Sequence, residues 1–466
     1  MKNNISCGTL CREEETIIAQ CTPRGSGAIA LLRISGADAL HITSKIAQLT
    51  SKKNLVAQKS HTIHLGWVTD SSGKKIDQVL FLLMHGPHSF TGQNTVEITA
   101  HNNPFIIDAI IEAAIQAGAR LAQEGEFSKR AFLNNKIDLL QAEAINELIH
   151  AQTQKSLKAS LSQLNGSLSH KIDSFEQELT KALAYCEASF EFIEDENVEF
   201  VHEINTIIEK IVQSIAQLKK TFKRQEHIRQ GVRITLLGSV NAGKSSLFNA
   251  LLDSERAIVT NIPGTTRDTI EAGLFNKETY QTLIDTAGLR HTKNIIEKEG
   301  IQKSLLEAKK ADIILLVIDG SKKQTKQETK IYQKILSDYP QKTLIVQNKN
   351  DLGNVDQTWL SSKKIIAISC KHKKNIDLLK NHIDEKIKTL FFAIESPFLL
   401  NQRQHGLLLS LEKKLTSIAP MLDENTQYEL VSLHLKDALS DLAEFSGKTV
   451  DKKMLDKVFS SFCIGK

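Results

Sequence analysis

The chain has 466 residues, which is enough for several domains and a substantial core, and its 41% hydrophobic and 24% charged residues are typical of a soluble globular protein. No apolar run reaches the length of a membrane span, and the N-terminus lacks the apolar segment of a signal peptide. Six cysteines without metal-ligand spacing indicate reduced thiols, so we expect a cytoplasmic protein. The net charge of +5 is too small to indicate a nucleic-acid partner by itself.

Residues 1–135 are predicted to form an α+β domain. Short runs such as "AIALLRISG", "QVLFLLMHG" and "NTVEITAHN" have the length and apolar character of strands, and turn residues separate them. Residues 136–229 instead contain apolar positions at 3- and 4-residue spacing, which predicts long helices. The basic run at 218–233 is either a solvated helix face or a contact to RNA or phosphate.

Residues 230–388 contain a predicted strand, a turn and a helix in "RITLLGSVNAGKSSLFNALL". Within this stretch, 238–245 fits the phosphate-loop pattern G-x4-G-K-[ST]. The glycines allow backbone N–H groups to face phosphates, and the helix N-terminus adds its positive dipole end. Lys244 is expected to reach the β- and γ-phosphates, while the Ser245 hydroxyl ligates Mg²⁺.

Three further motifs follow, each at the end of a predicted strand. In "TLIDTAG", Asp285 would hold the Mg²⁺ shell and the Gly288 N–H would sense the γ-phosphate. In "NKND", the carboxylate of Asp351 can accept from guanine N1–H and the 2-amino group together, and Asn348 and Lys349 of the same motif would brace the base and the neighbouring loop. The stretch 369–371 resembles the last guanine-contacting motif of such domains. The order of the motifs predicts an α/β P-loop GTPase domain of the Ras-like kind.

The catalytic position of this domain is unusual. Leu289 stands where Ras-like switches have the glutamine that orients the attacking water. Asn241 could instead ligate a monovalent cation placed where an arginine finger would act, and carbonyls of "TNIPGTTRD" could complete its shell while Thr266 ligates Mg²⁺. Glu297 could orient water through a bridge.

Residues 389–466 are predicted to be helical again, so the economical arrangement is one helical domain, 136–229 plus 389–466, into which the GTPase domain is inserted. The rival arrangement has two separate helical domains. The chain then ends in "CIGK". Cys463 could be a prenyl acceptor, a reactive thiol on a tail or a buried cysteine, although Gly465 and Lys466 are unusual choices for prenylation.

These stretches resemble the MnmE (TrmE) family of bacterial GTPases that act in tRNA wobble-uridine modification. The resemblance extends from Glu15 to Lys466 and is most specific in "TIIAQCTPRGSGAIALLRISG", "SFTGQNTVEI", "GEFSKRAFLNNKIDLLQAEAI", "AIVTNIPGTTRD", "DTAGLR" and the terminal "CIGK". One departure is the Asn102-Asn103 pair, which replaces two glycines of the family and can still adopt a left-handed backbone.

The resemblance implies that the N-terminal domain binds 5-formyl- or 5,10-methylene-tetrahydrofolate and mediates homodimerisation. Matching motif positions imply that folate is contacted by Arg33, Glu97, Lys136 and Lys466. Cys463 would lie beside that pocket as a catalytic residue, and the family's water-positioning glutamate would be Glu297. We expect Phe459 and Phe462 to pin the tail to the helical domain.

The resemblance further implies a GTPase activated by K⁺, with Asn241, Thr260, Ile262 and Thr265 as the potassium ligands. It assigns the GTP contacts to Asn241, Ala242, Gly243, Lys244, Ser245, Ser246, Thr260, Thr265, Thr266, Asp285, Thr286, Ala287, Gly288, Asn348, Lys349, Asp351, Ser369, Cys370 and Lys371. The implied partner is the FAD-dependent protein MnmG (GidA), with which the family adds an aminomethyl or carboxymethylaminomethyl group to C5 of tRNA uridine 34. One alternative is a ribosome-assembly GTPase, but such proteins often carry a Gly-x-x-Gly RNA-binding loop, which this chain lacks. The other alternative is a lipid-anchored signalling GTPase. We expect no membrane anchor.

Overall fold

The computed structural model describes residues 15–25, 27–191, 200–220, 222, 231–252, 270–276, 279–285, 306–353, 358–360, 364–392, 398–423 and 426–466. Packing divides the chain into two compact units. The first consists of Met1–Asn146, Ser162–Gln213 and Gly406–Lys466, and the second of Glu147–Leu161 and Ser214–His405.

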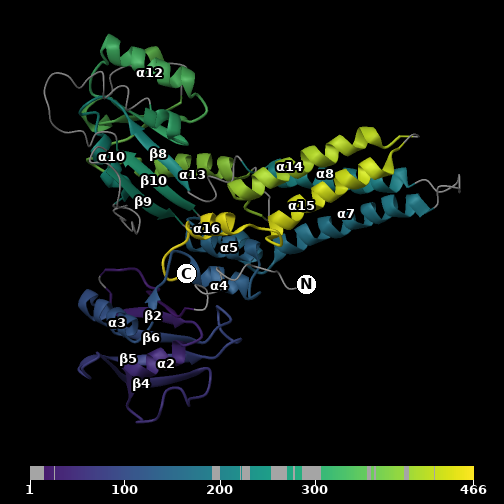
Figure 1. Cartoon of the computed structure of the whole chain (residues 1–466). Helices are drawn as coiled ribbons and strands as arrows, with labels where there is room; N and C mark the ends of the chain where they lie inside the picture. Colours follow the sequence, from purple (N-terminus) through teal and green to yellow (C-terminus); the bar gives the residue numbers. More distant parts are fainter. Residues whose placement is uncertain are drawn as a thin grey trace. The chain divides into compact units, whose positions relative to one another are not determined.

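A seven-stranded sheet with the order β3-β4-β5-β6-β2-β1-β7 forms the N-terminal part of the first unit (Figure 1). Its strands are β1 (Ile17–Gln20), β2 (Ile29–Ser35), β3 (Ala47–Leu49), β4 (Thr62–Thr69), β5 (Lys75–Met84), β6 (Thr95–His101) and β7 (Arg120–Leu121). Neighbouring strands are antiparallel except β1 and β7, which are parallel. The helices α2 (Ala39–Ile46) and α3 (Pro104–Gln116) contribute buried side chains to one core with this sheet.

Alternation along the central strands separates the two faces of this sheet. Leu32 and Ile98 belong to the core, whereas Arg33 and Glu97 lie on the opposite face, where they oppose each other in register. The exposed parts of that second face carry apolar side chains as well, because Ile63 of β4 is 63% and Ile29 of β2 is 61% exposed.

The Asn102-Asn103 departure does not require a left-handed backbone at Asn103. Its backbone is extended, with φ −115° and ψ 128°, and its side chain accepts a hydrogen bond from the Phe105 N–H at the start of α3. Asparagine therefore serves here as an N-cap, a role in which its side-chain oxygen satisfies a free helix N–H group.

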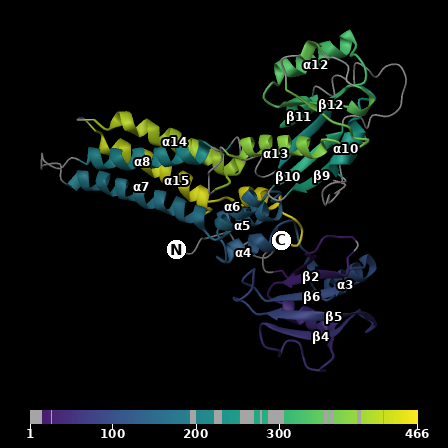
Figure 2. The ribbon, with the colours of Figure 1, turned by 180° about the vertical axis from the view of Figure 1, so that it is seen from behind.

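Helices make up the rest of the first unit. They are α4 (Glu126–Leu133), α5 (Leu139–Ile149), α7 (Ser167–Glu191), α8 (Val201–Lys220), α14 (Gln402–Ile418), α15 (Tyr428–Ser446) and α16 (Lys452–Phe459), of which α5, α8 and α14 extend into stretches assigned to the second unit. The long helices α7 and α15 pack along each other, and both views show them side by side (Figures 1 and 2). A smaller core joins Leu139 of α5 to Phe459 of α16 and to Phe462, so the predicted anchoring of the tail by these two phenylalanines is confirmed.

The second unit is built on a six-stranded sheet with the order β13-β12-β11-β8-β10-β9. Its strands are β8 (Val232–Leu237), β9 (Ile270–Asn276), β10 (Thr279–Asp285), β11 (Ile313–Asp319), β12 (Thr343–Asn348) and β13 (Ile365–Ala367). Only β9 is antiparallel to its neighbour. The unit's helices include α6 (Gln154–Leu164), which extends into the first unit, α10 (Lys244–Leu252), α12 (Lys326–Asp338) and α13 (Ile376–Phe392), and its short 3-10 helices include η2 (Asn350–Leu352) and η3 (Thr358–Leu360).

Helices cover both faces of this sheet. Residues of α10 and α13 share one core with Ile313, Leu315 and Val317, whereas Tyr332 and Ile335 of α12 share another core with the alternate residues of β11. All seven residues of β11 are buried, as expected for a central parallel strand. The predicted fold class, an α+β domain with a helical domain and an α/β P-loop domain, is confirmed. None of the helices in the described part of the chain combines the length and apolar character needed to cross a membrane.

Candidate functional site

The phosphate loop connects β8 to α10, and its own backbone carbonyls hold the Lys244 side chain in place. Lys244 is 7% exposed, and its Nζ donates hydrogen bonds of 2.8 Å to the carbonyl oxygens of both Gly238 and Ser239. Burial lowers the pKa of Lys244, although the nearby Asp285 carboxylate opposes this effect. An ammonium group desolvated in this way gains most when an anionic phosphate reaches it.

Close packing explains why two positions of the phosphate loop are occupied by glycine. A Cβ on Gly238 would lie 2.1 Å from the Val317 carbonyl oxygen, and one on Gly243 would lie 2.1 Å from Nδ2 of Asn348. The backbone at Gly243 also has a φ of +93°. Asn241, the predicted potassium ligand, adopts a left-handed backbone with φ +62°, which asparagine tolerates better than most residues.

The guanine-binding motifs meet at the carboxyl ends of β11, β12 and β13. Asn348 is 3% exposed; its Nδ2 donates to the Ala242 carbonyl at 3.1 Å, and its Oδ1 accepts from the Cys370 N–H at 3.2 Å. Lys349 Nζ donates to Asp319 Oδ2 at 2.7 Å. Asn348 therefore ties the phosphate loop to the last guanine motif.

Asp351 is oriented by the same motif. Ser369 Oγ donates a hydrogen bond of 2.6 Å to Asp351 Oδ1, and this bond lowers the pKa of the Asp351 carboxyl. The carboxylate is therefore ionised at neutral pH, as an acceptor for two guanine N–H donors must be. Burial raises the pKa of the Cys370 thiol to about 11, although a hydrogen bond with the Asn348 side chain opposes this effect.

The structure places the other predicted nucleotide residues as follows. Asp285 ends β10 and is 1% exposed, while Ser245 and Ser246 are exposed in the first turn of α10, and Lys371 is exposed after β13. The remaining predicted residues of this site lie outside the described residues: Thr260, Ile262, Thr265, Thr266, Thr286, Ala287, Gly288 and Glu297.

Arg33 and Glu97 form a second polar site in the first unit. Arg33 Nε donates to Glu97 Oε1 at 2.8 Å, and the two side chains are 14% and 16% exposed. The guanidinium carbon of Arg33 lies 5.4 Å from the ring centre of Phe90 and 5.5 Å from that of Phe127. The aromatic rings and the carboxylate hold the guanidinium in one orientation.

The C-terminal tail reaches this part of the unit. The Phe127 N–H donates to the Lys466 carbonyl at 3.1 Å, and a Cβ on Gly465 would lie 2.8 Å from the Cα of Cys21. Gly465 has a φ of +91°, so glycine is needed both for space and for backbone conformation. Cys463 itself is exposed, which excludes the alternative of a buried packing cysteine.

Lys136 stands at the edge of the same region. Its Nζ donates to the Pro87 carbonyl at 3.0 Å, and a Cβ added at Gly92, where φ is +74°, would lie 3.3 Å from the Lys136 Cγ. The loop 85–94 that carries these contacts also carries Phe90, which packs against Arg33. Of the four predicted folate residues, Arg33 and Glu97 are in direct contact.

One site residue was not predicted. Cys21 follows β1, and its N–H donates to the Leu31 carbonyl at 2.7 Å. Because Ala19 pairs with Arg33, strand alternation places Cys21 on the face that carries Arg33 and Glu97. Burial raises the pKa of the Cys21 thiol, and the charges of Arg33, Glu97 and Lys466 also act on it. The alternation of residues 17–21 could have indicated this position, but only pairing with β2 shows which face it shares.

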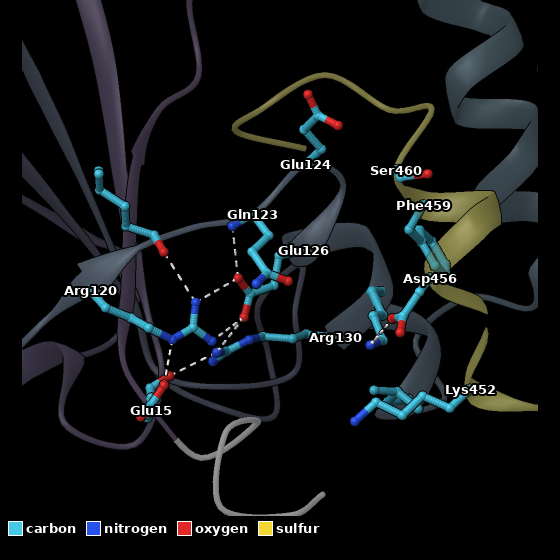
Figure 3. A pocket seen from close by; sticks show the side chains of 13 residues that line it. Glu15, Arg120, Gln123, Glu124, Glu126, Arg130, Lys452, Asp456, Phe459 and Ser460 are labelled. Carbon is cyan, nitrogen blue, oxygen red and sulfur yellow. Dashed lines mark hydrogen bonds and ion pairs between the residues drawn. The ribbon is translucent and has the colours of Figure 1, made fainter. Parts of the chain in front are cut away.

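A cavity of about 800 Å³ lies elsewhere in the first unit, between β7, α4 and α16 (Figure 3). Arg120 and Arg130 both pair with the buried Glu126, at 2.6 and 2.9 Å, and Arg120 also pairs with Glu15. Although burial opposes it, hydrogen bonds from Arg120 lower the pKa of Glu126 to about 2. The positive and negative side chains along this cavity pair with one another. These ion pairs link Arg120 of β7 to Glu126 of α4 within the unit.

The family models match nearly the whole chain. The model described as "MnmE helical domain" matches residues 139–463, and the one described as "GTP-binding protein TrmE N-terminus" matches residues 16–136. The G domain of the T. maritima FeoB iron transporter aligns with 33% of this chain and 98% of its own at 26% identity and a TM-score of 0.26.

Curated relatives match over their full length. A tRNA modification GTPase MnmE of Aquifex aeolicus is 38% identical over 97% of this chain and 100% of its own. The proteins of the same name in Petrotoga mobilis and Protochlamydia amoebophila are each 37% identical over 97% of this chain, and over 99% and 98% of their own. With a phosphate loop, a guanine-binding set and a C-terminal tail seated beside Cys21, the chain belongs to the MnmE (TrmE) family of tRNA modification GTPases.

Proposed function

We propose that this protein is the GTP-hydrolysing component of tRNA wobble-uridine modification and that it helps to install an aminomethyl or carboxymethylaminomethyl group at C5 of uridine 34. Relatives that match over the full length are named tRNA modification GTPases. The observation that carries the proposal is the seating of the C-terminal tail, because it brings an exposed thiol at Cys463 to the unit that holds the Arg33–Glu97 pair.

GTP binding follows from the geometry of the second unit. Asp351 would select guanine through its two carboxylate oxygens, of which Oδ1 accepts a hydrogen bond from Ser369 Oγ, and Lys244 would contact the β- and γ-phosphates. Mg²⁺ would be held by the Ser245 hydroxyl with Thr266, and K⁺ by Asn241 with Thr260, Ile262 and Thr265. Asn241 is exposed in the phosphate loop, where a cation ligand must be accessible. K⁺ would supply positive charge as GTP is cleaved, and Glu297 would position the attacking water.

The Arg33–Glu97 pair is chemically suited to a reduced folate. A carboxylate accepts from adjacent ring N–H and amino donors, as Glu97 could for a pterin, while Phe90 and Phe127 offer rings beside it. The ammonium groups of Lys136 and Lys466 match the carboxylates of the folate tail. Bound tetrahydrofolate would supply the one-carbon unit. The chain's own residues would hold and orient it, and Cys463 would face the uridine.

We propose that the sheet face bearing Arg33 and Glu97 is also the homodimer surface. Exposed apolar residues continue across this face on β2, β4 and β5: Ile29, Ile63, Leu65 and Leu80. The opposite face is already covered by α2 and α3. An exposed apolar surface of this kind favours a protein partner, and a second copy would place two polar sites at one interface.

The remaining chemistry requires a redox partner. We propose that the FAD-dependent protein MnmG acts with this chain on tRNA, because a flavin supplies the electron-transfer chemistry. The ribosome-assembly alternative gains no support, since the tail and the Arg33–Glu97 site would have no role in it.

Mass spectrometry of wobble nucleosides tests the proposal. A strain that lacks this protein should lose the C5 modification of uridine 34 in the affected tRNAs, and the intact gene should restore it. An unchanged nucleoside profile in the deletion strain would refute the proposed function.

A further inference from the structure

The phosphate loop has a support that belongs to no nucleotide-binding motif. The Ser239 N–H donates a hydrogen bond of 2.8 Å to the hydroxyl oxygen of Tyr332, which lies on α12. Tyr332 is 3% exposed, so this hydroxyl is sheltered from bulk water. Burial raises the pKa of Tyr332, and the hydroxyl is therefore neutral across the physiological pH range.

The bond from Tyr332 acts on the same peptide group that holds Lys244. The Ser239 N–H and the Gly238 carbonyl belong to one planar peptide unit. Tyr332 accepts from the N–H end at 2.8 Å, and the carbonyl end accepts from Lys244 Nζ at 2.8 Å. Fixing one end of a rigid plane fixes the direction of the other, and hydrogen bonding at the N–H also strengthens the carbonyl as an acceptor.

We propose that Tyr332 is a positioning residue for nucleotide binding, which aims the ammonium group of Lys244 at the phosphates through the Gly238–Ser239 peptide. This inference rests on the GTP site proposed above. Loss of the hydroxyl leaves the Ser239 N–H without this bond and allows the peptide to rotate, and the Gly238 carbonyl then no longer points at Lys244.

Tyr332 is itself held by its surroundings. Its ring stacks on Trp359 of η3, with 5.9 Å between centroids and 24° between the planes, and both belong to one hydrophobic core with Ile335. Its helix begins with a capping box in which Thr325 and Glu328 satisfy each other's backbone N–H groups. The support of the phosphate loop is therefore a packed side chain on a capped helix.

Tyr332→Phe tests the inference because it removes one oxygen and keeps the ring on Trp359. We expect the affinity for GDP and GTP, measured with a fluorescent guanine nucleotide on the full-length protein, to fall roughly tenfold. Tyr339→Phe is the matched control: this tyrosine is at the C-terminal end of the same helix and contributes to the same core. Its replacement should leave the affinity within about twofold of the wild type.

A double-mutant cycle separates positioning of Lys244 from general stability. In a Lys244→Gln background, Tyr332→Phe should weaken binding by less than about threefold, because the group it positions is gone. Wild-type affinity in Tyr332→Phe, or equal losses in both backgrounds, would overturn the inference. If circular dichroism shows that Tyr332→Phe is unfolded, Tyr332→Met, whose flexible side chain fills part of the same space without a hydroxyl, is judged by the same two outcomes. Failure of the wild-type protein to bind GTP would instead refute the underlying nucleotide site.

Discussion

Replacing Glu126 with glutamine should destabilise the first unit by removing the anion that two arginines share. Glu126 accepts from Arg120 at 2.6 Å and from Arg130 at 2.9 Å, and its side chain is 9% exposed (Figure 3). Arg130 is 2% exposed, so the variant leaves a buried guanidinium without its carboxylate. Removal of one partner from such a pair is strongly destabilising.

The magnitude follows from the protonation of Glu126. Its pKa is lowered from 4.5 to about 2 in the folded protein, because hydrogen bonds and the charge of Arg130 outweigh burial. This difference corresponds to about 3 kcal/mol of stability. Since the folded state has the lower pKa, the contribution is fully present above pH 4.5 and is lost as the pH falls toward 2.

Urea unfolding followed by tryptophan fluorescence measures this effect. The chain has two tryptophans, and a Trp359→Phe background leaves Trp67 of β4 as a reporter of the N-terminal sheet. We expect Glu126→Gln to lower the free energy of unfolding by about 3 kcal/mol at pH 7 and by progressively less below pH 4.5. Glu124→Gln serves as control, because Glu124 is an exposed carboxylate on the rim of the same cavity.

Two results would refute this reasoning. One is a loss below about 1 kcal/mol at pH 7, which would mean that the ion-pair network is no stronger than an exposed pair. The other is a loss that stays constant as the pH falls through the range between the two pKa values, which would show that protonation of Glu126 is not its source.

Three further predictions concern function. Cys463→Ser should leave GTP hydrolysis and melting temperature nearly unchanged but abolish or sharply reduce wobble-uridine modification, and full modification in tRNA digests would contradict a catalytic thiol. GTP turnover should be faster in potassium than in sodium buffer of equal ionic strength, and Asn241→Ala should reduce the potassium-stimulated rate more than nucleotide binding; equal rates in both salts would rule out the cation mechanism. Asp351→Asn should cost several kcal/mol of GTP affinity and improve competition by xanthosine nucleotides, whereas an unchanged preference for GTP would show that the 348–351 motif is misassigned.

Local patterns were sufficient to predict much of this protein. The phosphate loop 238–245 is contiguous, so its glycines, Lys244 and the following helix could be predicted from spacing alone. The guanine motifs also lie in short stretches at strand ends, and parallel strands necessarily bring those ends to one edge of the sheet. The period of two along β2 and β6 likewise separates buried from exposed residues before the partner strands are known.

Contacts between distant stretches were decided only by the tertiary structure. Tyr332 lies 93 positions from the loop residue that it supports, and Cys21 shares a face with Arg33 only through the register of β1 and β2. Cys21 lies in a stretch that resembles the family, but its role, like that of Tyr332, depends on what packs against its side chain. The C-terminal tail depends on both sources of information. The sequence "CIGK" indicated that the tail has a function, whereas the close approach of Gly465 to Cys21 arises from packing of the whole first unit. The spacing of residues along the chain can predict groups that act together within one short stretch. The direction in which a side chain points, and how deeply it is buried, are set by the elements that pack over it.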